Sequence, residues 1–234
     1  MNTVLFDLDG TLVPITQKDF GNVYFKLLIS KNSDLNMSID TMKTALFSGI
    51  NAMVKNDGSV TNEQAFWNAF TSVADVSRKD CEIVFEKFYA TEFDEVKSVV
   101  TETDISKQLI SVLKQKGYKL ILATNPIFPI EAVEKRLKWV GLSKSDFSYI
   151  STYDNSSFCK PNPLYFKEIV DKLGLDVNEC LMVGNNAVED TCAEKIGIKT
   201  ILLTDTLENE NNLSLSAWEH YSQKDFLEKA KCFD

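Results

Sequence analysis

The sequence contains a single histidine, His220, among its 234 residues. This scarcity excludes a histidine-based catalytic triad and a histidine-rich zinc site, because each needs histidine beside the reacting groups. The five cysteines form no CxxC pair, and their odd number leaves at least one thiol unpaired. Free thiols are typical of a reducing compartment, so we expect a cytoplasmic protein.

Long apolar segments are also absent. No run approaches the ~20 residues that cross a bilayer, and the first residues lack the basic region of a signal peptide. The 34 acidic and 25 basic side chains give a net charge of −9, which repels polyanions at long range. We therefore expect no membrane or nucleic-acid partner. A small phosphorylated metabolite is compatible with this charge, because a local lysine or a bound cation outweighs a distant field.

The chain has the composition of a globular protein, with 44% hydrophobic and 25% charged residues. Short apolar runs predict strands that are buried on both faces, and amphipathic stretches between them predict helices. Alternating strands and helices favour an α/β fold with a doubly wound parallel sheet. The predicted strands are residues 4–6, 120–123, 147–150, 180–183 and 200–203, and the predicted helices between them are 104–116, 130–140, 163–174 and 187–195.

A long insertion separates the first two predicted strands. About a hundred residues are too many for a simple crossover connection, so they must form a unit of their own. From about residue 18 to residue 99 the apolar spacing is helical, with almost no strand signal. We therefore predict two domains, a catalytic core of residues 1–15 and 100–234 and an all-helical domain of residues 16–99.

Acidic residues follow directly on the first strand, in the segment Asp7-Leu8-Asp9-Gly10-Thr11. Side chains two residues apart in an extended segment face the same side, so Asp7 and Asp9 are expected to share one pocket. That pocket lies at the carboxyl edge of the sheet, where open parallel sheets bind ligands. Two carboxylates this close repel each other unless a cation or a proton lies between them.

Three further polar segments begin where other predicted strands end. They contain Thr124 and Asn125, then Lys160, and finally the run from Gly184 to Asp190. Because the carboxyl ends of parallel strands meet at one edge, a hydroxyl, an amide, an ammonium group and a second acidic cluster are expected to converge there.

This set of groups is suited to phosphoryl transfer, in which catalysis comes from positioning and from neutralising charge on the phosphoryl oxygens. An ionised Asp7 is a competent nucleophile, and Asp9 is placed to protonate the leaving oxygen and then to activate water. Thr124 can donate to phosphate oxygens, Asn125 can steady the phosphate-binding loop, and Lys160 supplies positive charge. Mg²⁺ would complete the charge balance with a few carboxylate or carbonyl oxygens.

In order and spacing, these four segments resemble the motifs of the haloacid dehalogenase-like (HAD) hydrolase superfamily. The resemblance implies that the helical insertion is the cap domain of that family. It also implies that Asp7 is the nucleophile and a Mg²⁺ ligand, and that Asp9 is the general acid/base and a ligand through its main-chain carbonyl. Thr124 and Lys160 would bind phosphate, and Asp190 would be the acidic residue of the metal-binding fourth motif. We therefore expect a magnesium-dependent phosphatase that acts on a small phosphate ester, as a monomer, through a phospho-aspartyl intermediate.

One departure from the family pattern concerns the metal. Phosphatases of this family usually have Gly-Asp at the start of the fourth motif, whereas this chain has Asn185 followed by Asn186. An amide oxygen can ligate but carries no charge, so Asn185 is a predicted ligand of a weaker magnesium site. Glu189 is the other acid of this segment.

Two alternatives are open. An Asn-containing fourth motif is similar to that of the 2-haloacid dehalogenases, but those enzymes lack an acid two residues after the nucleophile, so Asp9 favours the phosphatase. A HAD-fold binding or regulatory protein with low turnover is the second alternative, motivated by Asn185 and Asn186. The motifs do not identify the substrate.

Overall fold

The computed structural model describes residues 1–233, and its centre is a parallel sheet of six strands in the order β3-β2-β1-β4-β5-β6. The sheet confirms the predicted fold class, and each predicted strand region overlaps one of its strands. The sixth strand was not predicted, because Glu219 and His220 are exposed at the edge of the sheet and form no apolar run. The strands are β1 Thr3–Phe6, β2 Lys119–Leu122, β3 Tyr149–Ile150, β4 Cys180–Gly184, β5 Lys199–Leu203 and β6 Glu219–Tyr221.

Helices cover both faces of this sheet. Val4 and Phe6 belong to one buried apolar cluster, while Leu5 belongs to a second cluster on the opposite face. Alternate residues of β1 are therefore buried on opposite sides, which explains why the strand is apolar throughout. No helix among residues 1–233 combines the length and apolarity needed to cross a membrane. The helices associated with the sheet are α5 Ile105–Gln115, α6 Ile130–Trp139, α7 Pro163–Leu173 and α8 Gln223–Lys231.

The predicted helix over residues 187–195 is wrong, since the segment has turns and then a short 3-10 helix, Thr191–Ile196. The side chain of Asn186 accepts hydrogen bonds from the backbone N–H groups of Val188 and Glu189, each at 2.9 Å. Local side-chain acceptors of this kind compete with the helical hydrogen-bond pattern. The extra turns keep Asp190 at the edge of the sheet.

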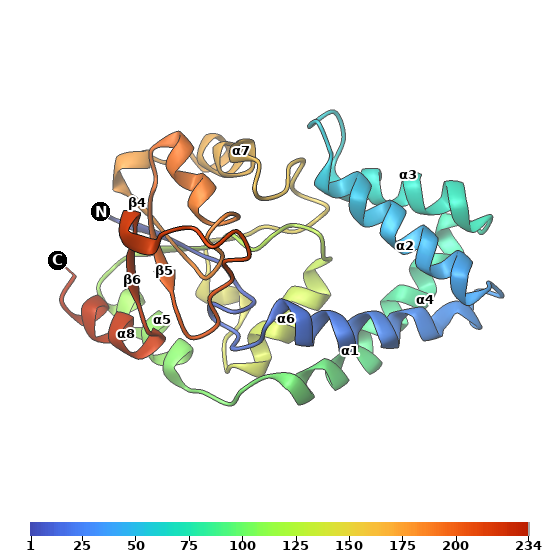
Figure 1. Cartoon of the computed structure of the whole chain (residues 1–234), viewed down its shortest axis with the longest axis horizontal. Coiled ribbons are helices and arrows are strands. Elements are labelled where there is room, and N and C mark those ends of the chain that lie inside the picture. Colours follow the sequence, from blue (N-terminus) through green and yellow to red (C-terminus); the bar gives the residue numbers. More distant parts are fainter. Residues whose placement is uncertain (234) are drawn as a thin grey trace.

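Helices occupy the insertion between β1 and β2, and Figure 1 shows them extending away from the sheet. We call residues 16–99 the helical insertion. Its third helix begins with a capping box, in which Thr61 and Gln64 bond reciprocally to the backbone. The helices are α1 Gln17–Ile29, α2 Ile39–Val54, α3 Asn62–Ala74 and α4 Arg78–Ala90, with the 3-10 helices Ser30–Asn32 and Glu92–Val99.

Asn62 joins the helical insertion to the loops at the sheet edge. This side chain is fully buried, and its Nδ2 donates to the carbonyl oxygens of Pro126, at 3.1 Å, and Phe158, at 3.4 Å. Pro126 follows the segment after β2, and Phe158 precedes the lysine loop. The insertion therefore rests on two of the loops that carry the predicted site residues.

Candidate active site

The register of the sheet places the first, second and fourth motifs at one level. Phe6 pairs with Leu122 on one side and with Val183 on the other, so the next residues of all three strands emerge together. The backbone N–H of Asp7 still donates to the carbonyl of Val183 at 3.0 Å. Asp7 thus begins the loop at the carboxyl edge, as the sequence predicts.

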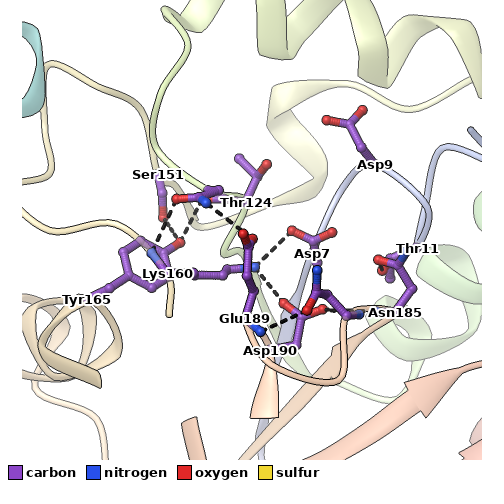
Figure 2. Close-up of polar contacts among 12 residues, drawn as sticks. Asp7, Asp9, Thr11, Thr124, Ser151, Lys160, Tyr165, Asn185, Glu189 and Asp190 are labelled. Atoms are coloured by element: carbon purple, nitrogen blue, oxygen red, sulfur yellow. Dashed lines mark hydrogen bonds and ion pairs between the residues drawn. The ribbon is translucent and has the colours of Figure 1, made fainter. Parts of the chain in front are cut away.

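Lys160 connects the first and fourth motifs directly. Its ammonium Nζ donates to Oδ1 of Asp7 at 2.8 Å and to Oδ1 of Asp190 at 2.7 Å. The side chain is only 1% exposed and passes near the rings of Tyr165 and Phe166. Figure 2 shows the lysine reaching between the two carboxylates. The structure therefore brings together three predicted site residues that are far apart in the chain.

Both oxygens of Asp190 are engaged by the protein. Oδ2 accepts hydrogen bonds from the backbone N–H groups of Asn185 and Asn186, each at 2.9 Å, while Oδ1 contacts Lys160. A Cβ atom at residue 184 would lie 2.1 Å from Asp190 Oδ2, so only glycine fits at Gly184. The fourth motif is thus folded around the Asp190 carboxylate.

Asn185 points toward the turn of the first motif rather than toward Asp7. Its Oδ1 accepts the Thr11 hydroxyl at 3.1 Å, and its Nδ2 donates to the carbonyl of Thr206 at 2.8 Å. The amide also packs against Gly10, whose φ of 80° suits a glycine. Asn185 therefore braces the loop that carries Asp7 and Asp9.

Asp9 lies apart from the cluster of Asp7, Lys160 and Asp190. Its Oδ2 forms an ion pair with Nη1 of Arg136, a fully buried residue of α6. The guanidinium stacks over the ring of Phe128 at 4.3 Å and faces Phe20 of α1 at 5.5 Å. Oδ1 of Asp9 and Nη2 of Arg136 are buried without a hydrogen-bond partner among the residues described.

The sequence analysis missed Arg136, although a signal was present. The residue follows Val133 by three positions and precedes Leu137, so it lies on the apolar face predicted for that helix. A charged residue on a buried helix face requires a partner of opposite charge. That partner proves to be Asp9.

Thr124 and Asn125 occupy the loop after β2, as expected. The carbonyl of Thr124 accepts the Tyr165 hydroxyl at 2.8 Å, whereas the Thr124 hydroxyl makes no hydrogen bond within residues 1–233. Oδ1 of Asn125 accepts the backbone N–H of Lys160 and Nδ2 donates to Glu189, both at 3.2 Å. Asn125 thus ties the lysine loop to the fourth motif, and the free Thr124 hydroxyl is available to a ligand.

The site holds more negative charge than its lysine neutralises. Burial raises the pKa of Asp7 to about 7, and the charges of Asp190 and Asp9 add to this effect while Lys160 opposes it. Burial likewise raises the pKa of Glu189 to about 7, with Lys160 opposing and Asp190 contributing. Although burial disfavours a charged lysine, the Asp190 and Asp7 carboxylates hold the pKa of Lys160 well above its ordinary value.

These raised pKa values predict that the metal-free protein loses stability as the pH rises. A carboxyl whose pKa is higher in the folded state binds more protons there than in the unfolded chain. The free energy that Asp7 contributes to stability in this way is complete below its ordinary pKa of 3.8. This contribution is lost as the pH rises through its folded-state pKa of about 7. We expect Asp7→Asn, which removes this titration, to be more stable than wild type by on the order of 3 kcal/mol at about pH 8 and nearly equal at about pH 4.

Urea unfolding in EDTA at both pH values measures this difference. The matched control is Asp171→Asn, because Asp171 is an exposed carboxylate of α7 paired with Lys167, and its effect should be small at both pH values. A difference between wild type and Asp7→Asn that does not change with pH would contradict the proposed charge excess.

The charge excess suits a cation, and of the four predicted ligands the structure brings the side chains of Asp7 and Asp190 together. Among residues 1–233, no group of three or more His, Cys, Asp or Glu side chains is placed to hold a metal ion. Asp9 is turned to Arg136 and Asn185 to Thr11. Asp7 and Asp190 do lie together, and Oδ2 of Asp7 makes no hydrogen bond within the described chain.

Comparisons with known proteins agree with the fold and with the family that the sequence resembles. A family model described as haloacid dehalogenase-like hydrolase matches residues 1–197. Pyrophosphatase PpaX of Bacillus velezensis is 24% identical over 220 residues, which span 92% of this chain and 88% of the relative.

Solved structures share the same fold over nearly the whole chain. A HAD phosphatase from Thermococcus onnurineus is 22% identical with a TM-score of 0.61, covering 98% of this chain and 97% of that structure. The HAD-hydrolase YfnB from Bacillus subtilis, solved with bound magnesium, is 19% identical with a TM-score of 0.57 and 99% coverage of both chains. A dehalogenase is 15% identical with a TM-score of 0.57, covering 98% of this chain and 96% of that one.

Proposed function

The chain belongs to the haloacid dehalogenase-like hydrolases, and from this premise we propose that it is a magnesium-dependent phosphatase that hydrolyses a small phosphorylated metabolite through a phospho-aspartyl intermediate. The observation that carries the proposal is the contact of Lys160 with both Asp7 and Asp190 at the carboxyl edge of the sheet. Phosphoryl transfer needs a nucleophile and compensating positive charge at one point, and this contact provides both.

Each of the proposed catalytic groups has a free atom for its role. Lys160 holds Oδ1 of Asp7, so Oδ2 is the oxygen that attacks phosphorus while the bond from phosphorus to the ester oxygen breaks. Oδ1 of Asp9, which has no partner in the described chain, gives a proton to the leaving oxygen and later takes one from the hydrolytic water. The Thr124 hydroxyl and Lys160 bind the phosphoryl oxygens.

Arg136 and Asn125 position these groups. Arg136 pairs with Oδ2 of Asp9 and leaves Oδ1 without a partner, and Asn125 accepts a hydrogen bond from the backbone N–H of Lys160.

In the proposed arrangement, the core comprises residues 1–15 and 100–234, and the helical insertion of residues 16–99 is a cap. A cap over the site would exclude water during transfer and admit it afterwards.

Mg²⁺ would be held by Asp7 and Asp190, with the main-chain carbonyl of Asp9 and the amide oxygen of Asn185 completing the protein ligands. When bound, it would neutralise charge on the phosphoryl oxygens and on the surplus carboxylates. This assignment is supported by the placement of the Asp7 and Asp190 carboxylates around the single ammonium group of Lys160.

Magnesium binding should be weak, because Asn185 contributes no charge and already bonds to Thr11 and Thr206. We expect a dissociation constant above about 10 μM in calorimetric titration, and we expect Asn185→Asp to tighten binding by at least about tenfold. Asn178→Asp is the control, because Asn178 bonds to Asp176 and lies outside the fourth motif. This change should leave the magnesium affinity unchanged. A dissociation constant below about 10 μM for wild type would contradict the assignment.

Phosphate release tests the activity itself. Para-nitrophenyl phosphate and a panel of phosphorylated metabolites are incubated with Mg²⁺ or with EDTA, and turnover is expected only with the metal. Chloride release from a 2-chloro acid without any phosphate release would replace the proposal by the dehalogenase. Tight binding of a phosphate ester without turnover of any of them would replace it by the binding protein.

A further inference from the structure

A cavity of about 540 Å³ lies between the helical insertion and the segment that follows the Thr124 loop. Interior voids in proteins are few and rarely much larger than a water molecule, whereas ligand sites span roughly 300–1,000 Å³. The cavity therefore has the size of a binding site. Its apolar walls come from α1, α2, α3, α4 and the segment before α6, and include Met53, Phe66, Trp67, Phe85, Tyr89 and Phe128.

From this cavity we infer that the substrate has an apolar leaving group, an aromatic ring or a branched hydrocarbon without a second anionic group. The inference rests on the proposed function, because it assigns the cavity to the part of a phosphate ester that leaves. It adds the class of substrate, which neither the motifs nor the comparisons identify.

A short chain of contacts connects the cavity to the proposed chemistry. Phe128 lines the cavity and its ring lies 4.3 Å from the guanidinium carbon of Arg136. Arg136 in turn pairs with Asp9, the group proposed to protonate the leaving oxygen. Tyr24, which also lines the cavity, packs on Phe128 with ring centroids 5.4 Å apart. Two side chains, Phe128 and Arg136, thus link the cavity to the residue that would protonate the leaving oxygen.

The charges around the cavity oppose a second anion. Six acids and two lysines contribute to its lining. Ion pairs engage Glu63 and Glu82 with Arg78, Glu134 with Lys144, and Lys135 with Asp94. Glu86, Glu131 and Asp154 have no ion pair within residues 1–233, and Lys138 is the remaining cation of the lining. This acidic surplus repels a carboxylate or a second phosphate.

The polar groups among the aromatic side chains of the cavity are hydroxyls and an indole N–H, which carry no positive charge to bind an anion. The hydroxyls of Tyr24 and Tyr89 bond to each other at 2.8 Å. The buried indole N–H of Trp67 has no hydrogen-bond acceptor at bonding distance in the described chain, and the Tyr153 hydroxyl lies beside it. These groups can orient a neutral ligand by one or two hydrogen bonds, which is the usual composition of a small-molecule site.

The test compares esters that differ in the leaving group. Wild type should hydrolyse 1-naphthyl phosphate with a kcat/KM at least about tenfold higher than glycerol phosphate or pyrophosphate, because the ring buries apolar area that the others lack. Ile50→Trp fills the cavity and should remove this advantage, lowering kcat/KM for the naphthyl ester at least about tenfold while changing that for glycerol phosphate less than about twofold. Phe47→Trp is the matched control, because Phe47 lies on the outward face of the same helix and is 53% exposed.

Calorimetry with 1-naphthol measures binding to the cavity without any hydrolysis. It therefore distinguishes failure of the inference about the apolar site from failure of the proposed phosphatase function. If no ester is hydrolysed but 1-naphthol binds wild type and not Ile50→Trp, the proposed function fails and the apolar site stands. If glycerol phosphate or pyrophosphate is the better substrate and 1-naphthol does not bind, the inference is overturned and the phosphatase stands. Should circular dichroism show that Ile50→Trp is unfolded, the smaller change Leu46→Phe on the same wall takes its place.

Discussion

Replacing Asp7 by asparagine is expected to lower kcat for para-nitrophenyl phosphate by at least about 10⁴-fold in the presence of Mg²⁺. The amide cannot form the acyl phosphate, so the two-step route through a covalent intermediate is lost. The fold should persist, because Lys160 retains its contact with Asp190 and the amide fits the space of the carboxyl group.

Stopped or continuous assays of para-nitrophenol release measure this loss. Asp171→Asn is again the control, since it removes an exposed carboxylate whose partner is Lys167 on the same helix, and it should keep full activity. Circular dichroism and urea unfolding confirm that the Asp7→Asn variant is folded. Activity of the folded variant above about 1% of wild type would rule out Asp7 as the nucleophile.

Replacing Lys160 by methionine is expected to destabilise the metal-free protein by about 3–5 kcal/mol, the range found when one member of a buried ion pair is removed. Asp7 and Asp190 would then face each other without the ammonium that now contacts both at 2.8 and 2.7 Å. In the presence of Mg²⁺, kcat for para-nitrophenyl phosphate should also fall by about 10²–10³-fold, because a donor to the phosphoryl oxygens is lost.

A control and a double variant separate charge from packing. Lys167→Met removes an exposed lysine with an i,i+4 partner and should cost less than about 1 kcal/mol in urea unfolding. Adding Asp190→Asn to Lys160→Met removes one of the two uncompensated carboxylates. The double variant should therefore be more stable than the sum of the two single-variant effects predicts. Strict additivity would show that Lys160 contributes packing and not charge compensation.

The alternation of apolar runs and amphipathic stretches was sufficient to predict the parallel sheet. Each strand is buried on both faces, so residues such as Val4 to Phe6 read as a continuous apolar segment. Polar residues placed directly after such runs must lie at the carboxyl edge, because parallel strands share a direction. For this reason Asp7, Lys160 and Asp190, separated by up to 183 positions by their numbering, were expected together and lie together.

Side-chain directions at the same edge were not predictable in this way. Asp9 was expected to share a pocket with Asp7, yet it turns to Arg136, which lies 127 positions further along the chain. Asn185 was expected beside the acids, yet it bonds to Thr11. In both cases the partner lies on a distant segment of the chain, Arg136 for Asp9 and Thr11 and Thr206 for Asn185, so the local alternation of an extended strand does not determine where the side chain bonds.

By itself, the sequence determined the fold class, the helical character of the insertion and the edge of the sheet at which Asp7, Lys160 and Asp190 lie. These properties follow from the spacing of apolar residues along helices and strands and from the shared direction of parallel strands. Such spacing can be recognised within a few neighbouring residues. Only the tertiary structure decided that Arg136 pairs with Asp9, that Asn125 ties Lys160 to Glu189, and that an aromatic cavity opens under Phe128. Those contacts join helices and loops far apart in the chain, and their energies are realised only when the packed elements bring the groups within hydrogen-bond or van der Waals distance.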